Sequence, residues 1–428
     1  MNCAHSCGSF EHVVARRRFL GGLALGTGAL AGGLSWLQHP LAANELASQQ
    51  KRMIVIRMAG GLSQLESWDP KPGVSTGGPF RAIPTSVPGI HISELLPLTA
   101  RQMHHLALIR SINTHENEHG RGNYLVMTGR RQVPGTDHPR LGAVVAKALD
   151  DERSSLPGHI LIQASGNGRN ADAAYLGPRY ASVVLADGKP PRHTERPKGL
   201  DEAGFRRRNE LQRRINDRFA LRRRTAETDA YTQSYDQALE MMRQRDVFDL
   251  SKESDKDKER YGSHDFGRHC LMARRLLEHG ITYVQVTHSN YDTHNENFNF
   301  HFEQLSEFDG PFATLVQDLV DRGLWDSTLL VVLSEFGRTP KINRRYGRDH
   351  WGKSWSMCLG GAGIQRGALI GATNEKGTEV TEREVDTGHL FHTYLRALGL
   401  KSQRHFKIDG RNIPMADPAF EPIKELLA

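Results

Sequence analysis

Cysteine is scarce in this sequence, since only four occur among 428 residues. Cys3 and Cys7 lie at the N-terminus, whereas Cys270 and Cys358 are far apart in the main part of the chain. No Cys-x-x-Cys spacing is present, which excludes a thiolate zinc site. Cys270 and Cys358 could pair, but one falls in an expected helix and the other in an apolar strand. We therefore expect both to be buried small hydrophobic side chains.

The sequence also lacks a large excess of charge of one sign, and it has few long apolar runs. Lys and Arg total 56 against 49 Asp and Glu, a net charge of +7, which over this much surface does not indicate a nucleic-acid partner. Beyond the N-terminal region, no apolar run approaches the length of a membrane span. With 38% hydrophobic and 25% charged residues, the chain is neither collagen, a coiled-coil rod nor wholly disordered. It is long enough to bury a core without disulfides.

The N-terminus has the pattern of an export signal. Arg-Arg-Arg-Phe-Leu at 16–20 precedes an uncharged stretch, 21–37, rich in Gly, Ala and Leu, and small residues follow up to Ala43. This order resembles a twin-arginine signal. The alternative is a transmembrane anchor, for which the stretch is at the short limit. We expect residues 1–43 to direct export by the twin-arginine machinery and then to be cleaved off, leaving a periplasmic or extracellular protein with no membrane span.

Strand and helix patterns alternate along residues 50–428. Such alternation, with apolar runs as strands, is typical of a mostly parallel sheet buried on both faces. We expect one three-layer α/β/α domain with a helical insertion at 200–262. The expected strands are 53–58, 106–110, 159–164, 282–287 and 328–334, and the expected helices are 97–104, 119–128, 141–149, 270–279 and 302–322.

The insertion is rich in arginine, with runs at 206–208, 213–214 and 222–224. Such runs can contact a phosphate backbone. However, Leu211, Ile215 and Phe219 recur every four residues, which predicts an amphipathic helix with a solvated basic face. We therefore expect no nucleic-acid partner, although the helix could hold an anionic glycan or a membrane surface.

Histidines and carboxylates follow several expected strands. In open α/β sheets, ligands bind beyond the carboxyl ends of the strands, so these residues are expected at one edge. Histidine and carboxylate together favour zinc, manganese or iron over calcium, which prefers oxygen alone. In Asp292-Thr-His294 two candidate ligands share one side of an extended segment. The clusters are Glu66 and Asp69 after the first strand, His115, Glu116, Glu118 and His119 after the second, His288, Asp292, His294 and Glu296 after 282–287, and Glu335, Arg338, Asp349 and His350 after 328–334.

Each of these residues also has a structural interpretation. Asp292 could close a turn, Glu335 could cap a helix or pair with Arg338, and His115 and His119 could share an exposed helix face. Four clusters in one chain favour a metal-binding or catalytic edge.

Several blocks resemble the family called domain of unknown function 1501. The most specific are Glu-Phe-Gly-Arg-Thr-Pro-Lys-Ile-Asn at 335–343 and Gly-Arg-Asp-His-Trp at 347–351. Others lie at 58–64, 68–72, 248–253, 260–262 and 270–276, so the resemblance covers most of residues 53–400. The family is similar to the sulfatase and alkaline-phosphatase superfamily and is commonly exported through the twin-arginine route. The resemblance therefore implies a three-layer fold with a divalent metal (zinc, manganese, iron or calcium) at the strand ends.

The resemblance assigns the metal to Asp292, His294, Glu335 and His350. Asp292 and His294 match the Asp-to-His ligand segment of the superfamily. Glu335 stands where an Asp-His pair normally follows a late strand, and His350 stands where a final histidine ligand lies.

The chain departs from the superfamily at two places. Sulfatases carry Cys or Ser ten residues before the Gly of a Thr-Gly pair, but ten residues before Gly129 this chain has His119. A formylglycine mechanism is thus excluded at that position. The acidic pair after the first strand is replaced by Gly60 and Gly61.

The sequence therefore predicts a metal-dependent hydrolase of sulfate or phosphate esters, small or polymeric, that lacks the usual nucleophile. His119 would be a general acid or a further ligand, and Arg338 and Arg348 would neutralise substrate charge. Ser63 and His115 are further candidate substrate contacts. The alternative is a non-catalytic sulfatase-like shell that binds anionic polysaccharide or a cell-envelope partner.

Overall fold

A computed structural model describes residues 50–150, 156–164, 172–191, 194–223 and 226–428. Residues Ser48–Ala428 form one unit. The expected export signal at 1–43 lies outside the described residues. Among the helices that are described, none combines the length and apolar character needed to cross a bilayer.

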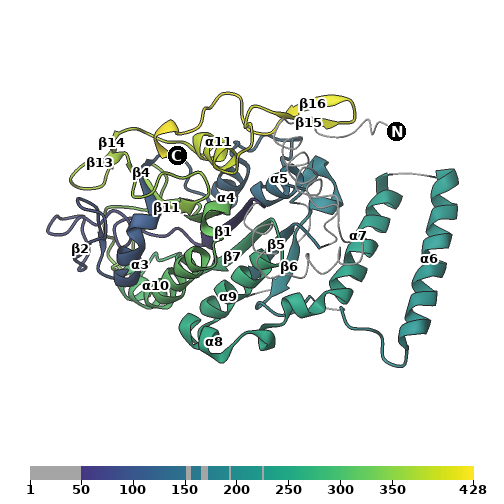
Figure 1. The fold of residues 1–428 in the computed structure, drawn as a ribbon. Helices are drawn as coiled ribbons and strands as arrows, with labels where there is room; N and C mark the ends of the chain where they lie inside the picture. Colours follow the sequence, from purple (N-terminus) through teal and green to yellow (C-terminus); the bar gives the residue numbers. More distant parts are fainter. Residues whose placement is uncertain (1–49, 151–155, 165–171, 192–193, 224–225) are drawn as a thin grey trace, which may run out of the picture. The chain divides into compact units, whose positions relative to one another are not determined.

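The centre of the fold is an eight-stranded sheet (Figure 1). Its strand order is β12-β4-β11-β8-β1-β7-β5-β6. Every neighbouring pair is parallel except the two that involve β11, which is antiparallel to both β4 and β8. The strands are β1 (Arg52–Met58), β4 (Leu106–Ile112), β5 (His159–Gln163), β6 (Val183–Ala186), β7 (Tyr283–His288), β8 (Thr328–Leu333), β11 (Trp355–Gly361) and β12 (Leu369–Ile370).

The central strands end at the same level. Met58 of β1 is level with His288 of β7, and Arg57 is level with Leu333 of β8. Because all three strands are parallel, the segments that follow them meet at one edge. That edge is where the sequence predicted the site.

Helices cover both faces of this sheet, which confirms the predicted three-layer α/β/α fold (Figure 1). Alternate residues of β1 separate the two cores, since Ile54 and Ile56 belong to one cluster and Met53 and Val55 to the other. The first core is completed by α3 (Pro97–Gln102), α9 (Asp265–Glu278) and α10 (Asn297–Asp321), and the second by α4 (His119–Thr128), α5 (Leu141–Ala148) and α11 (Thr387–Ala397).

The expected insertion is helical. It contains α6 (Glu202–Arg223), α7 (Ala226–Arg243) and α8 (Asp255–Tyr261). Four small two-stranded sheets lie elsewhere: β2 (Ala82–Pro84) with β3 (His91–Ser93), β9 (Gly337–Arg338) with β10 (His350–Trp351), β13 (Ala372–Thr373) with β14 (Val380–Glu382), and β15 (His405–Ile408) with β16 (Arg411–Pro414). Cys270 and Cys358 are both free and buried, as expected.

Two buried histidines make the fold sensitive to acid. Burial lowers the pKa of His288 and of His301 from 6.5 to about 4. His301 is held neutral, because its Nε2 accepts from the Ser63 N–H at 3.1 Å while its Nδ1 donates to the Asn297 carbonyl at 2.8 Å. Protonating Nε2 would break the first of these bonds.

We expect the free energy of unfolding to fall as the pH is lowered from 6.5 to about 4. Between these two pH values, His288 and His301 are protonated in the unfolded chain but not in the native protein. The free energy of unfolding therefore falls by about 3 kcal/mol for each histidine, and the fall is complete below the native pKa. Urea denaturation at several pH values measures it. In His301→Gln the pH-dependent loss should shrink by about half, and an unchanged pH dependence would show that His301 does not titrate in this way.

Candidate metal centre at the carboxyl edge of the sheet

The position of His119 is set by the start of α4. Glu118 caps this helix, because its carboxylate accepts hydrogen bonds from the backbone N–H groups of Gly120 and Arg121 at 2.8 and 2.7 Å. A capping carboxylate satisfies N–H groups that have no partner within the helix. His119 is therefore the first residue of α4, at the edge where β4 ends.

His350 is positioned by the β9–β10 hairpin. In this hairpin His350 is level with Arg338. The side-chain amide of Gln64, from the loop after β1, accepts from the Arg338 N–H and donates to the Arg338 carbonyl, at 3.0 and 2.9 Å. The hairpin is thereby fixed to the carboxyl end of β1.

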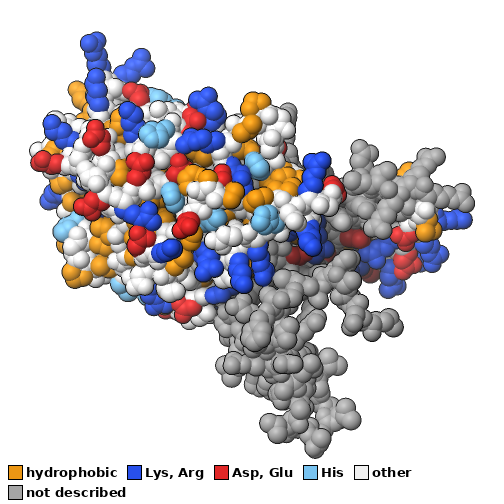
Figure 2. All heavy atoms as spheres, turned by 90° about the horizontal axis from the view of Figure 1, so that it is seen from above, with side chains coloured by type: hydrophobic (Ala, Val, Ile, Leu, Met, Phe, Trp, Pro, Cys, Tyr) orange, Lys and Arg blue, Asp and Glu red, His pale blue; other side chains and the backbone are white. Residues whose placement is uncertain are grey.

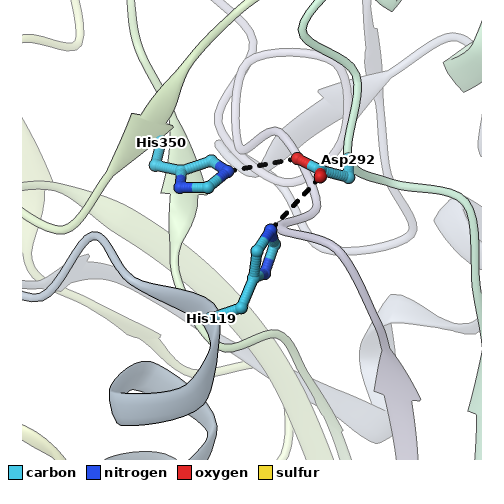
Figure 3. A group of neighbouring side chains, drawn as sticks. All are labelled: His119, Asp292 and His350. Atoms are coloured by element: carbon cyan, nitrogen blue, oxygen red, sulfur yellow. Dashed lines mark hydrogen bonds and ion pairs between the residues drawn. The ribbon is translucent and has the colours of Figure 1, made fainter.

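Asp292, which follows β7, is the centre of the cluster (Figure 3). Its Oδ2 lies 3.3 Å from His119 Nε2, and its Oδ1 lies 3.1 Å from His350 Nε2. The same Oδ1 is 3.1 Å from His294 Nε2, which is 3.0 Å from His350 Nε2. Ligand atoms of His119, Asp292 and His350 all lie within 4.8 Å of one another, a spacing that can hold a metal ion.

All three histidines have Nδ1 hydrogen-bonded to an acceptor oxygen. His119 Nδ1 donates to Glu335 Oε1 at 2.8 Å, and His294 Nδ1 donates to Asp349 Oδ1 at 2.7 Å. His350 Nδ1 donates to the Asn117 carbonyl at 2.7 Å. A neutral imidazole carries one N–H, so each Nε2 then has a free lone pair. Three lone pairs and a carboxylate thus meet at one place.

This donor set suits a divalent cation. Metal-binding histidines characteristically donate their other N–H to a carboxylate or a backbone carbonyl, which fixes the tautomer and the ring orientation. Zinc–ligand bonds of about 2.0 Å in a tetrahedral site give ligand atoms about 3.3 Å apart. The 3.0–3.1 Å separations among Asp292, His294 and His350 are close to that value.

One fixed positive charge already lies beside the cluster. The guanidinium of Arg338 is fully buried and donates to Asp292 Oδ1 at 2.6 Å and to the Gly61 carbonyl at 2.9 Å. It also donates to the carbonyls of Gly60 and Arg348. Arg338 therefore holds the carboxylate of Asp292 in one orientation.

Gly60 and Gly61 make room for this arrangement. Both have positive φ, +117° and +91°, a region in which L side chains are strained. A Cβ on Gly60 would lie 2.5 Å from the Asp292 nitrogen, and a Cβ on Gly61 would lie 2.8 Å from the Phe336 ring. Glycine at both positions is thus required for the close approach of the Asp292 loop and Phe336.

The histidines differ in proton affinity. The hydrogen bond to Glu335 raises the pKa of His119, whereas burial lowers the pKa of His350. For Asp292, burial opposes ionisation, but the hydrogen bond and positive charge of Arg338 outweigh it and hold the pKa of the carboxyl well below its usual range. At neutral pH Asp292 is ionised, and His119 holds a proton more readily than His350 does.

The family is shown by sequence comparison. The profile of the family described as "Protein of unknown function (DUF1501)" matches residues 50–427. The chain belongs to this family. A search of curated proteins found no match.

Several solved structures are similar to this DUF1501 chain. The lipoteichoic acid synthase LtaP from Listeria monocytogenes is 10% identical, with 87% of this chain and 76% of that chain covered and a TM-score of 0.41. The PsFucS1 sulfatase from Pseudoalteromonas sp. is 13% identical, with 85% and 72% covered and a TM-score of 0.39. The zinc complex of the C-terminal periplasmic domain of EcEptC from Escherichia coli is 9% identical, with 82% and 84% covered and a TM-score of 0.39.

The DUF1501 structure brings together three of the four residues predicted as ligands, Asp292, His294 and His350. Glu335 does not contact Asp292 in the same way but supports His119 from behind. Glu335 Oε1 accepts from His119 Nδ1 and from the Gly60 N–H at 2.9 Å, so this carboxylate lies behind His119. The role of Asp292, His294 and His350 as metal ligands stays a prediction. His119, rather than Glu335, is the fourth residue of the cluster.

Two of the predicted substrate contacts are buried. Arg348 is fully buried and forms a two-point ion pair with Glu66, which is also fully buried. Its remaining N–H groups donate to the carbonyls of Thr339, Pro340 and Thr76. These bonds leave the guanidinium of Arg348 no donor for a substrate. Ser63 is also fully buried.

His115 has an exposed side chain at φ +53°. Its backbone N–H donates to the Gly352 carbonyl at 3.1 Å. Sequence reasoning did not select the Asn117 carbonyl, which accepts from His350. It placed Asp349 among the strand-end residues but did not predict that this carboxylate accepts from His294.

Replacing Glu335 by Gln is expected to weaken binding of a divalent metal by about 10–100-fold, because outer partners of metal-binding histidines have effects of this size. The neutral amide no longer favours the tautomer with a free Nε2 lone pair on His119. Calorimetric titration with Zn²⁺ and Mn²⁺ measures the change, and the exposed Glu375→Gln is the control. Equal affinities in the two variants would mean that His119 takes no part in binding.

Proposed function

We propose that this DUF1501 protein is a metal-dependent hydrolase of anionic esters, of the sulfate or phosphate class, that works without a Cys or Ser nucleophile. The observation that carries the proposal is the convergence of three imidazole lone pairs on the carboxylate of Asp292. Such a group of acceptors is stable only with protons or a cation between its members.

Asp292, His294 and His350 would hold the ion, with His119 as a fourth ligand or as a proton donor. Their nitrogen and oxygen atoms suit zinc, manganese or iron better than calcium. When bound, a divalent ion supplies a water of lowered pKa and neutralises charge on the ester.

The side chains divide the remaining work. Arg338 keeps Asp292 ionised and oriented. His119, whose pKa is raised by Glu335, gives a proton to the departing oxygen. Among the described residues, the ion pairs of Asp292 are with Arg338 and the three histidines, which carry neither a hydroxyl nor a thiol. This favours direct attack by water over a covalent intermediate.

Basic side chains next to the cluster support an anionic substrate. The loop between β9 and β10 contacts the segment after Asp292, since the Asn343 amide donates to the His294 carbonyl at 2.9 Å. Lys341, Arg344 and Arg345 on this loop and Lys353 just after β10 are exposed and form no ion pair with the described residues. They would attract a small ester or an anionic polysaccharide.

The test begins with protein stripped of metal by a chelator and reloaded with Zn²⁺, Mn²⁺, Fe²⁺ or Ca²⁺. We expect one of these ions to restore turnover on a panel of nitrophenyl sulfate, phosphate and phosphodiester substrates. Tight metal binding without turnover on small or polymeric esters, together with retention on an anionic polysaccharide, would favour a non-catalytic binding protein. Failure to bind any of the ions would defeat the metal centre itself.

We also propose that residues 1–43 direct export by the twin-arginine route to the periplasm or beyond. Replacing Arg16, Arg17 and Arg18 with Lys is expected to retain the protein in the cell with its N-terminus uncleaved. The intact mass of the exported protein gives the cleavage point. Unchanged export of the lysine variant would indicate a different route.

A further inference from the structure

Helix α6 exposes an apolar stripe. The side chains of Leu211, Ile215 and Phe219 are 59%, 57% and 50% exposed. They are spaced four residues apart and therefore lie along one side of the helix. The sequence predicted an amphipathic helix with a solvated basic face, and in the structure the apolar face is also in contact with water.

Helix α7 lies beside α6 (Figure 1), and the residues of α6 that form polar contacts with it are not those of the apolar stripe. Arg213 pairs with Asp236 of α7 at 2.8 Å, and the hydroxyl of Tyr235 donates to Asn209 at 2.7 Å. At 3.6 residues per turn, Asn209 and Arg213 lie about 120–160° around the helix from Ile215. The contact with α7 therefore uses the opposite side of α6.

Arginines border the stripe. Arg207, Arg214 and Arg218 lie along one flank and Arg208 lies near its beginning, and all four are exposed. They form no ion pair with the described residues, in contrast to Arg213. On the main body, the face in Figure 2 shows Lys and Arg interspersed with Asp and Glu. Helix α6 presents unpaired cations directly beside exposed aliphatic side chains.

We propose that α6 lies on an anionic lipid surface, with Leu211 and Ile215 between the headgroups and the flanking arginines on the lipid phosphates. A basic helix with an apolar face binds in the plane of such an interface, and each Arg near an anionic leaflet strengthens the attachment. The arginine stems can lie along the apolar layer while the guanidinium groups reach the phosphates.

Two other occupants fit less well. A second copy of the chain would bring two arginine flanks together, and their repulsion would oppose the apolar contact. A nucleic acid or a sulfated glycan would pair with the arginines but would leave the aliphatic stripe in water. Because no described helix can cross a bilayer, attachment through α6 is peripheral.

The test places an environment-sensitive dye on the stripe or opposite it, in the full chain with Cys3 and Cys7 replaced by Ser. Cys270 and Cys358 are buried. The dye is attached in Ile215→Cys or, as a matched control on another side of α6, in Glu210→Cys. We expect a blue shift at position 215, and none at 210, with vesicles of phosphatidylcholine and phosphatidylglycerol. Any binding through the N-terminal apolar segment is common to both chains.

A second variant tests the charges. Arg214→Gln combined with Arg218→Gln is expected to lower co-sedimentation with anionic vesicles by at least about tenfold without changing the far-ultraviolet circular dichroism. The proposal is overturned if position 215 shows no shift with these vesicles. It is also overturned if the shift appears with heparin or DNA instead, or if it follows protein concentration without lipid, which would indicate a second copy.

Discussion

Asp292→Asn is expected to lower affinity for divalent metal by more than about a hundredfold and to remove ester hydrolysis with it. The carboxylate of Asp292 contacts His119, His294, His350 and Arg338 together. Outer partners of metal-binding histidines already contribute about 10–100-fold, so removing a charged ligand should cost more. An amide of nearly the same shape keeps the volume but loses the charge that the cation requires.

Metal content after dialysis and competition with a chromogenic chelator measure this loss. His279→Ala is the matched control, because His279 is an exposed histidine at the end of α9. It should behave as the unaltered chain does. If Asp292→Asn kept full metal affinity, the ion would lie elsewhere and the proposed reaction would lose its basis. If the metal-free Asp292→Asn variant melts at the same temperature as the metal-free unaltered chain, its loss of metal affinity is not caused by unfolding.

Glu66→Gln is expected to lower the free energy of unfolding by about 3–5 kcal/mol, because it leaves the buried charge of Arg348 without its partner. The two side chains have no exposed surface, and the carboxylate of Glu66 also accepts from Asn297 at 3.0 Å. Arg348 in turn joins three backbone carbonyls near the β9–β10 hairpin. The loss should therefore loosen the hairpin that carries His350.

Urea denaturation at neutral pH measures the change. Glu94→Gln is the control, since Glu94 pairs with Arg81, whose side chain is 84% exposed, and exposed pairs contribute about 0–1 kcal/mol. Similar losses in both variants would mean that the buried pair contributes no more than a surface pair. That outcome would remove the structural role we assign to Arg348.

The layers of the fold could be predicted because the central strands have local signatures. The segments at 53–58 and 328–334 are mostly apolar, and they form β1 and β8 within one residue of the expected bounds. The helix expected at 302–322 begins earlier, at Asn297. Its first turn has alternating Asn and Phe, which is not helical spacing, so the sequence pattern did not predict this start. β6 and α11 were not predicted. The strand is only four residues long, at the edge of the sheet.

The site was less accessible to sequence reasoning, for a physical reason. Strand-end position indicates which edge a residue reaches, but it does not indicate which partner its side chain meets. Glu66 and Arg348 are separated by 282 positions, so no local pattern could reveal that they neutralise each other. The same holds for Glu335, whose partner His119 is 216 positions away. Only the packed structure distinguishes a residue that faces the cation from one that supports it.

The guanidinium of Arg338 limits how many ions the centre can take. It is bonded to Asp292 and to the carbonyls of Gly60 and Gly61, so the end of β1 already has a permanent, immobile monocation. A second divalent ion there would face electrostatic repulsion from this guanidinium. Saturated protein should therefore contain a single ion per polypeptide, and raising the metal concentration should leave that ratio unchanged.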